Sequence, residues 1–333
     1  MNAQTNRVLF TKDASYWFKG LAILMVIISH YAEWWAWFHT LEGTSELIRS
    51  GLSRFGPYGV AIFFLFSGYG LSKSAGDKRI GLPFIAKRLS SVYLPYLIVA
   101  ILIELLSDGL QTFHDFIDIL YANDFWYMTV IFLFYLAFIV IWLLSDNRHI
   151  RAIAITIFTL TLNHRLMTME LQDFWYLSNT AFLIGILAAL YEPLLLKVVD
   201  KMGFVLCAVF GIGSILTIRA ALFTQSVWAT PEDAIQARLY AVLGFTLFIL
   251  FFAAKWKWHD VVLRFLGHHS LYLYLTHTFL FMWAVNYFSY EMPVRFVIAA
   301  VITIVVSILL NYIISGMMRG INVCLKKRLR KKE

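Results

Sequence analysis

Long apolar runs, separated by short polar breaks, follow one another along most of the chain. Reading for about 20 apolar residues between breaks predicts ten helices that could each cross a bilayer. The fifth is the shortest and lies between Arg151 and Asn163. The pattern predicts an all-α, polytopic membrane protein with about ten transmembrane helices. They cover residues 18–38, 56–72, 92–106, 126–144, 150–162, 175–191, 204–222, 239–254, 269–288 and 294–318.

The composition excludes an ordinary soluble domain. Of the 333 residues, 60% are hydrophobic and only 14% are charged, against about 25% charged in soluble domains. A net charge of +8 on a soluble chain would suggest nucleic-acid binding, but in a membrane protein basic residues mark cytoplasmic loops. The expected partner is therefore the lipid bilayer and not nucleic acid. Cys207 and Cys324 have no spacing that suggests a disulfide or a metal site.

The loops between the predicted helices differ in charge. With the N-terminus in the cytoplasm, 22 of the 28 Lys and Arg fall in cytoplasmic segments, and the other six are all Arg. One missed helix would invert every later loop, so this asymmetry favours ten spans with both termini in the cytoplasm. No cleavable signal is expected before the first helix. We expect residues 1–333 to form one membrane-embedded domain with no appended soluble domain.

A titratable ring lies inside the first predicted helix, in the stretch WFKGLAILMVIISHYAEWW. Lys19 precedes His30 by eleven residues, or 1100°, so both lie on one face about 16 Å apart. Glu33 follows one turn later. A charge at the bilayer centre costs about 2.5–3.5 kcal/mol, whereas a neutral imidazole can act as a general base. Alternatively, His30 only hydrogen-bonds a neighbouring helix, and Lys19 is a snorkelling anchor.

Two stretches near the predicted cytoplasmic side could bind a ligand. FFLFSGYGL places Ser67 and Gly68 in the second helix, where small residues let helices approach closely or leave room for a thin ligand chain. The loop over residues 73–96 carries five basic residues, including Lys87 and Arg88. These either determine topology or form a phosphate-binding patch.

The ninth predicted helix also contains histidines, in the stretch LGHHSLYLYLTHTF. His268 and His269 fall at the cytoplasmic boundary, where we expect them to be solvated. His277 falls near the middle, where we expect it to face the bundle interior.

Aromatic residues gather in the predicted outer loops. Residues 108–124 repeat apolar side chains at helical spacing opposite Asp115 and Asp118, which predicts an interfacial amphipathic helix. The stretches DFWYM and DFWYL open the fourth and sixth helices and contribute Trp126, Tyr127 and Trp175. They form either an aromatic belt at headgroup level or a platform on which a sugar ring stacks.

These stretches together resemble the bacterial acyltransferase family 3 of integral membrane O-acyltransferases, over nearly the whole chain. The family's first helix carries a basic residue, ten intervening residues and a histidine, as Lys19 and His30 do here. GVAIFFLFSGYGL, FIAKRLSSVYLPY, NDFWYMTVIFLFY and LGHHSLYLYLTH are similar to its later motifs. Two departures are visible. Ser91 stands where a second arginine is common, and Ser270 and Tyr272 are spaced one residue wider than usual.

The resemblance implies transfer of an acyl group, commonly acetyl, from cytoplasmic acyl-CoA to a carbohydrate hydroxyl of the bacterial cell envelope. Acyl-CoA would be a co-substrate, with no permanently bound cofactor, and polysaccharide synthesis machinery is a possible partner. The expected location is the bacterial inner membrane. From the residues and the resemblance together, we expect catalysis by His30 with Glu33, donor binding by Lys19, Ser67, Gly68, Lys87 and Arg88, and acceptor contact by Trp126, Tyr127 and Trp175, with His277 as a further intramembrane group.

Two other functions stay open at this point. In a sugar or solute transporter, His30 and Glu33 would form a proton relay. In a non-catalytic synthesis partner, the chain would act only in complex with a polysaccharide synthase.

Overall fold

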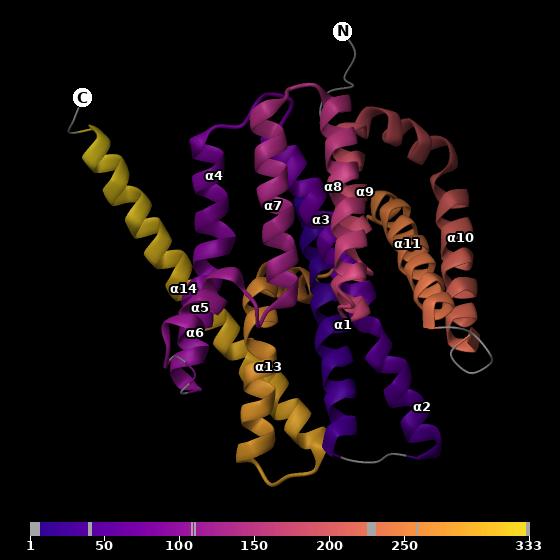
Figure 1. Cartoon of the computed structure of the whole chain (residues 1–333), viewed down its shortest axis with the longest axis vertical. Helices are drawn as coiled ribbons and strands as arrows, with labels where there is room; N and C mark the ends of the chain where they lie inside the picture. The colour runs from indigo at the N-terminus through magenta and orange to yellow at the C-terminus, as the bar shows by residue number, and fades with distance from the viewer. Residues whose placement is uncertain are drawn as a thin grey trace. The chain divides into compact units, whose positions relative to one another are not determined.

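The computed structural model describes residues 7–38, 42–107, 109, 111–224, 231–257 and 259–330. Within these residues the fold is helical, and no strand occurs. Figure 1 shows the succession of helices. They are α1 (Lys12–Phe38), α2 (Gly43–Leu52), α3 (Gly56–Ala75), α4 (Leu82–Arg88), α5 (Leu94–Leu106), α6 (Phe113–Tyr121), α7 (Trp126–Leu144), α8 (Arg148–Thr168), α9 (Asn179–Leu190), α10 (Glu192–Thr224), α11 (Pro231–Lys255), α12 (Val261–His268), α13 (Ser270–Tyr287) and α14 (Met292–Arg330), with 3-10 turns η1 (Ser53–Phe55) and η3 (Asp173–Trp175) and a π-helical turn η2 (Leu89–Tyr93).

The prediction of an all-α membrane protein is confirmed. Each of the ten predicted segments overlaps a helix. Eight helical stretches in the described part of the chain are long and apolar enough to cross a membrane. They are Lys12–Phe38, Gly43–Ala75, Leu82–Leu106, Trp126–Leu144, Asp173–Leu190, Glu192–Ala220, Asp233–Lys255 and Met292–Met318.

The other two predicted spans are helices of greater polarity. α8 has 21 residues and is longer than the predicted 150–162, but it includes three arginines. α13 has 18 residues and includes His277 and several hydroxyl side chains. The exact number of spans and their orientation stay predictions.

Several helix boundaries differ from the expected ones. α10 begins at Glu192, well before the predicted 204, and Figure 1 shows that it changes direction along its length. Three short helices, α2, α4 and α12, were not predicted, because a search for apolar runs of about 20 residues passes over them.

The chain divides into two compact units. Unit 1 comprises Met1–Ala32, Leu41–Gly81 and Trp126–His268, and unit 2 comprises Glu33–Thr40, Leu82–Phe125 and His269–Glu333. The prediction of one membrane-embedded domain stays a prediction.

In unit 1, α3 packs most closely against α9. A Cβ added to Gly68 would meet the Phe182 carbonyl oxygen at 2.2 Å, and one added to Gly185 would meet the Leu65 carbonyl oxygen at 2.1 Å. Each glycine thus lets the other helix's backbone approach. α10 and α11 form a second close pair, visible side by side in Figure 1.

A buried carboxylate joins three segments of unit 1. Glu192, at the start of α10, is 6% exposed. It accepts hydrogen bonds from the Leu9 backbone N–H (2.7 Å), the Tyr69 hydroxyl and the Lys73 ammonium (2.6 Å). Since a buried charge is tolerated when it is paired and hydrogen-bonded, Glu192 serves as a structural acceptor.

A buried guanidinium organises the loop after α3. Arg151, on α8, is 1% exposed and donates to the carbonyl oxygens of Gly76 (3.3 Å), Asp77 (3.0 Å) and Lys78 (3.0 Å). Its guanidinium also lies 4.8 Å from the Trp142 ring centroid. The first residues of this basic loop are therefore fixed by α8.

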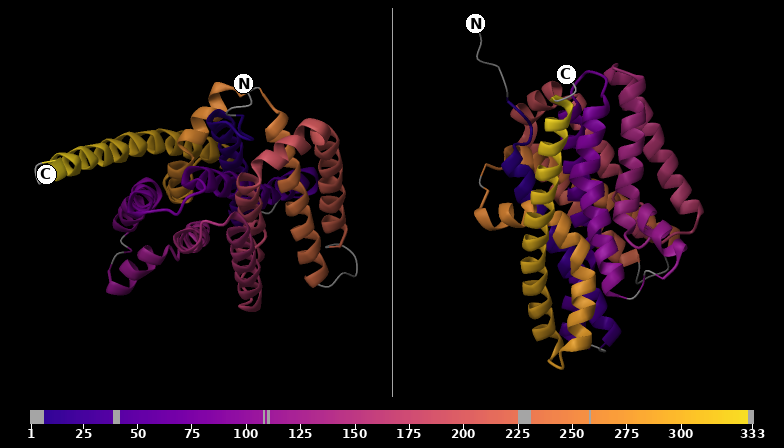
Figure 2. Two further views of the ribbon diagram at one scale, coloured as in Figure 1. Left: turned by 90° about the horizontal axis from the view of Figure 1, so that it is seen from above. Right: turned by 90° about the vertical axis from the view of Figure 1, so that its left-hand side faces the viewer.

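In unit 2, α13 and α14 form an antiparallel pair, which Figure 2 shows side by side. Buried polar groups link them. Thr276 and Ser307 hydroxyls lie 3.2 Å apart, and the Asn311 amide nitrogen lies 2.9 Å from His269 Nδ1.

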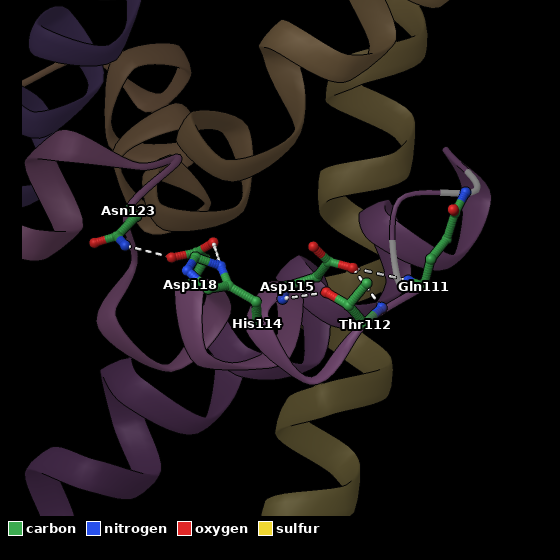
Figure 3. Close-up of polar contacts among 6 residues, drawn as sticks. All are labelled: Gln111, Thr112, His114, Asp115, Asp118 and Asn123. Carbon is green, nitrogen blue, oxygen red and sulfur yellow. Dashed lines mark hydrogen bonds and ion pairs between the residues drawn. The ribbon is translucent and has the colours of Figure 1, made fainter.

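The predicted amphipathic helix before the fourth span exists as α6, in unit 2. Thr112 and Asp115 form a capping box in which the Thr112 hydroxyl accepts from the Asp115 N–H, and Asp115 accepts from the Thr112 N–H (Figure 3). Further along α6, Asp118 lies 2.8 Å from His114 Nδ1 and accepts a hydrogen bond from the Asn123 side-chain amide (2.6 Å). Phe113 is 78% exposed, as expected of a side chain that faces lipid.

Candidate active site

α1 carries both titratable groups on which the functional prediction rests. It is one unbroken helix from Lys12 to Phe38, so Lys19 and His30 lie on one face. Both side chains are half-buried, whereas Glu33 is exposed. The helix therefore presents a basic group and an imidazole three turns apart.

Close backbone contacts hold the Lys19 end of α1 against α12, within unit 1. A Cβ on Gly20 would meet the Leu263 carbonyl oxygen at 1.9 Å, and one on Gly267 would meet that of Tyr16 at 1.8 Å. The Trp17 indole N–H also donates to Asp260 (2.5 Å). Lys19 thus projects from a rigidly packed turn.

Two hydrogen bonds brace α1 beside His30. The Ser29 hydroxyl donates to the Ser53 carbonyl oxygen (2.5 Å), and Arg49 on α2 donates to the Ala32 carbonyl oxygen (3.1 Å). Glu46 receives the other guanidinium N–H groups at 2.7 and 2.5 Å. Because the contacts fall one residue before and two residues after His30, they restrict the movement of this turn of the helix.

The predicted donor residues lie in both units. In unit 1, Ser67 is half-buried, but Gly68 is covered by α9, so close helix packing occupies the space beside it. In unit 2, Lys87 is exposed at the end of α4, and Arg88 lies 5.3 Å from the Phe84 ring centroid. The π-helical turn η2 follows Arg88 directly, a feature often found at functional sites.

The two DFWY stretches meet within unit 1. The Trp126 and Trp175 ring centroids lie 6.2 Å apart, and Phe174 lies 5.1 Å from Trp126. Tyr127 is buried against Phe64. The sequence repeat is therefore a spatial cluster of aromatic rings.

The histidines of the ninth predicted span differ in their surroundings. His277 is buried, as expected, with Nδ1 2.6 Å from the Tyr274 carbonyl oxygen and the ring stacked at 6.1 Å on Trp34. His268 is exposed, as expected, but the expectation of a solvated His269 is wrong. His269 is 4% exposed, because Asn311 on α14 binds its ring.

Sequence reasoning missed Arg49, Arg151 and Glu192. The Glu46–Arg49 spacing of three residues is a helical ion-pair signal that the sequence shows between the first two predicted spans. The loop carbonyl groups that Arg151 binds and the donors to Glu192 lie 73 to 183 residues away, so no local pattern reveals these contacts.

The family of the chain follows from its sequence. The sequence model of acyltransferase family 3, described as an acyltransferase domain, matches residues 14–312, nearly the whole chain. Searches of curated proteins and of solved structures found no match. The matched region contains every predicted site residue, from Lys19 to His277. The chain therefore belongs to acyltransferase family 3 and is a multi-pass membrane acyltransferase.

Proposed function

We propose that the protein transfers an acyl group, commonly acetyl, from cytoplasmic acyl-CoA to a hydroxyl group of a cell-envelope carbohydrate in the bacterial inner membrane. The observation that carries this proposal is the braced turn of α1 around His30, with Lys19 on the same face three turns away. General bases act best when their position is fixed relative to the reacting atoms.

In the proposed reaction, the His30 imidazole removes the proton from the acceptor hydroxyl as its oxygen attacks the thioester carbonyl. A C–O bond forms, the C–S bond breaks, and the imidazolium returns the proton to the CoA thiolate. The direct transfer requires no serine or cysteine nucleophile. The second ring nitrogen of His30 must be hydrogen-bonded to fix the tautomer, and Glu33 on the next turn of α1, or a hydroxyl or amide of a neighbouring helix, fills this role.

The donor side uses positive charge. Lys19, Lys87 and Arg88 hold the phosphates of CoA, since Lys and Arg are the usual protein partners of phosphate. The pantetheine arm passes Ser67, while Gly68 keeps α3 close to α9. The acceptor side uses the aromatic cluster of Trp126, Tyr127 and Trp175. Polysaccharide synthesis machinery would supply the acceptor.

Replacement of His30 tests the proposal. In His30→Ala protein purified in nanodiscs, we expect acyl transfer from radiolabelled acetyl-CoA to fall by about 10²- to 10⁴-fold, the usual effect of a general base. Binding of CoA should stay unchanged. His114→Ala is a matched control, because its ring is 80% exposed on α6.

Transfer at a near-normal rate by folded His30→Ala protein would contradict the role of His30. A sugar-dependent proton flux without consumption of acyl-CoA would instead identify a transporter.

A further inference from the structure

An ion pair lies next to the aromatic cluster of unit 1. Asp173, in η3, pairs with Arg238 on α11. Asp173 directly precedes Phe174 and Trp175 in the chain. The cluster and the ion pair are therefore built on one short turn, and the two opposite charges compensate each other.

Two buried polar atoms beside this turn are unused. Within the described residues, Arg238 Nε and Asn179 Oδ1 are buried and have no hydrogen-bond partner. Asn179 is fully buried, and its amide nitrogen donates to Asn163 Oδ1 (2.9 Å) and to the Trp175 carbonyl oxygen (3.0 Å). The two hydrogen bonds fix the orientation of the Asn179 side chain, in which Oδ1 has no hydrogen-bond partner.

Leaving such groups without a partner is unfavourable. A buried donor or acceptor that lacks a hydrogen bond has lost its contacts with water and gained nothing in exchange, and such atoms often mark a functional site. Arg238 Nε is a donor and Asn179 Oδ1 is an acceptor. Hydroxyl groups of a sugar both accept and donate hydrogen bonds, so they can satisfy both atoms. The half-buried rings of Trp126, Phe174 and Trp175 offer apolar faces for the C–H groups of a pyranose.

We infer that Asp173, Asn179 and Arg238, together with Trp126 and Trp175, form an acceptor subsite that selects an uncharged pyranose. Arg238 Nε donates to one hydroxyl and Asn179 Oδ1 accepts from another, while the rings stack against the sugar. Because Asp173 neutralises Arg238, a carboxylate or an ammonium on the sugar gains no net attraction and loses its hydration. This inference rests on the proposed function.

Three matched probes test the selectivity. They are methyl β-D-glucopyranoside, which is neutral, its 6-carboxylate, which is anionic, and its 2-amino derivative, which is cationic. Binding is measured by saturation-transfer NMR on full-length His30→Ala protein in nanodiscs, so the result does not depend on turnover. We expect the neutral probe to bind most tightly.

Variants of the ion pair should change the preference in opposite directions. Asp173→Asn leaves Arg238 uncompensated and should favour the anionic probe by about tenfold, and Arg238→Gln should favour the cationic probe by a similar factor. The double variant Asp173→Arg with Arg238→Asp should restore the neutral preference. Because the double variant keeps one positive and one negative charge, it also tests the inference if the single variants do not fold.

The aromatic face has its own test. Trp175→Ala should abolish binding of all three probes, whereas Trp283→Ala, at an exposed tryptophan in unit 2, should not affect binding.

Opposite shifts in the single variants would support the inference, since a purely structural ion pair would weaken all probes alike. Equal weakening of the three probes in folded single variants, or unchanged binding in Trp175→Ala, would overturn it. Acyl transfer would meanwhile still report on the proposed function, so the two failures are distinguishable.

Discussion

Arg88 and its neighbour Lys87 differ in their surroundings, and this difference bears on donor binding. Lys87 is exposed, whereas Arg88 is half-buried and stacks on Phe84. A stacked guanidinium is ordered before a phosphate arrives, so it loses less entropy when it binds. We therefore expect Arg88 to contribute more than Lys87 to the affinity for acyl-CoA.

For Arg88→Ala we expect the KM for acyl-CoA to rise about 10- to 100-fold with little change in kcat. A phosphate contact remote from the thioester stabilises the ground state and the transition state equally. Steady-state kinetics with acetyl-CoA measures both constants. Arg79→Ala is the control, because Arg79 is an exposed arginine in the preceding part of the same loop. A lost kcat at unchanged KM would place Arg88 in the chemistry or the fold.

Single residues could be predicted where their chemistry conflicts with their surroundings. An imidazole inside an apolar run, such as His30 or His277, stands out in the sequence. An ionisable side chain within the membrane is costly, so it usually has a structural or functional role. His269 was misjudged because its burial depends on Asn311, 42 residues later. The roles of the predicted site residues stay predictions.

At the scale of elements, the reciprocal glycines of α3 and α9 give a sharp test. In Gly68→Ala the new Cβ would meet the Phe182 carbonyl oxygen at 2.2 Å, which forces the helices apart. We expect a loss of about 1–3 kcal/mol in the free energy of unfolding. Thermal unfolding of the purified protein in detergent measures this loss of stability, and it can be repeated in the presence of CoA.

Gly70 provides the matched control in the same helix. It is exposed, and nothing lies within 4 Å of a Cβ added there. Gly70→Ala should therefore be neutral or slightly stabilising, because alanine favours a helix by up to about 1 kcal/mol over glycine. Equal stability of the two variants would contradict the packing role of Gly68.

The N-terminal cap of α6 should depend on pH. Hydrogen bonds from the Thr112 and Gln111 N–H groups lower the pKa of Asp115. Because the folded state has the lower pKa, the cap is fully effective above the unfolded value of about 3.9 and is lost as the pH falls through the folded value. We expect amide protection at the start of α6 to be lower at pH 3 than at pH 6.

Hydrogen exchange in nanodiscs, corrected for intrinsic rates, measures this loss. Asp115→Asn is the control, since an amide does not titrate here and its protection should be the same at both pH values. Wild-type protection that is identical at pH 3 and pH 6 would show that the carboxylate does not stabilise the cap.

The elements that the sequence predicted well are those with a long, uniform apolar run, such as α7, which spans 126–144 as expected. Hydropathy is less informative where a helix continues into polar sequence. α10 begins twelve residues early for this reason, and α8 extends beyond its apolar centre. α2 was missed because its ten residues are too few and too polar for a search for apolar runs of about 20 residues.

For the whole molecule, the sorting of Lys and Arg predicts which loops face the cytoplasm. In a chain with Cys207 and Cys324 replaced by Ser, a cysteine at Lys78 should resist a membrane-impermeant maleimide added to intact cells. A cysteine at His114, whose side chain is 80% exposed, should react. Both sites should react after the cells are opened. The reverse pattern in intact cells would exclude the ten-span topology with cytoplasmic termini.

Glu192 also determines the order in which the protein can be completed during synthesis. Its partners Leu9, Tyr69 and Lys73 are translated 119 to 183 residues before it. At about 5–20 residues per second, the ribosome needs roughly 6 to 24 seconds to travel from Lys73 to Glu192. Over that time the early helices are in the membrane without their common acceptor. The Leu9 N–H, the Tyr69 hydroxyl and the Lys73 ammonium therefore reach this acceptor only after the start of α10 has been made.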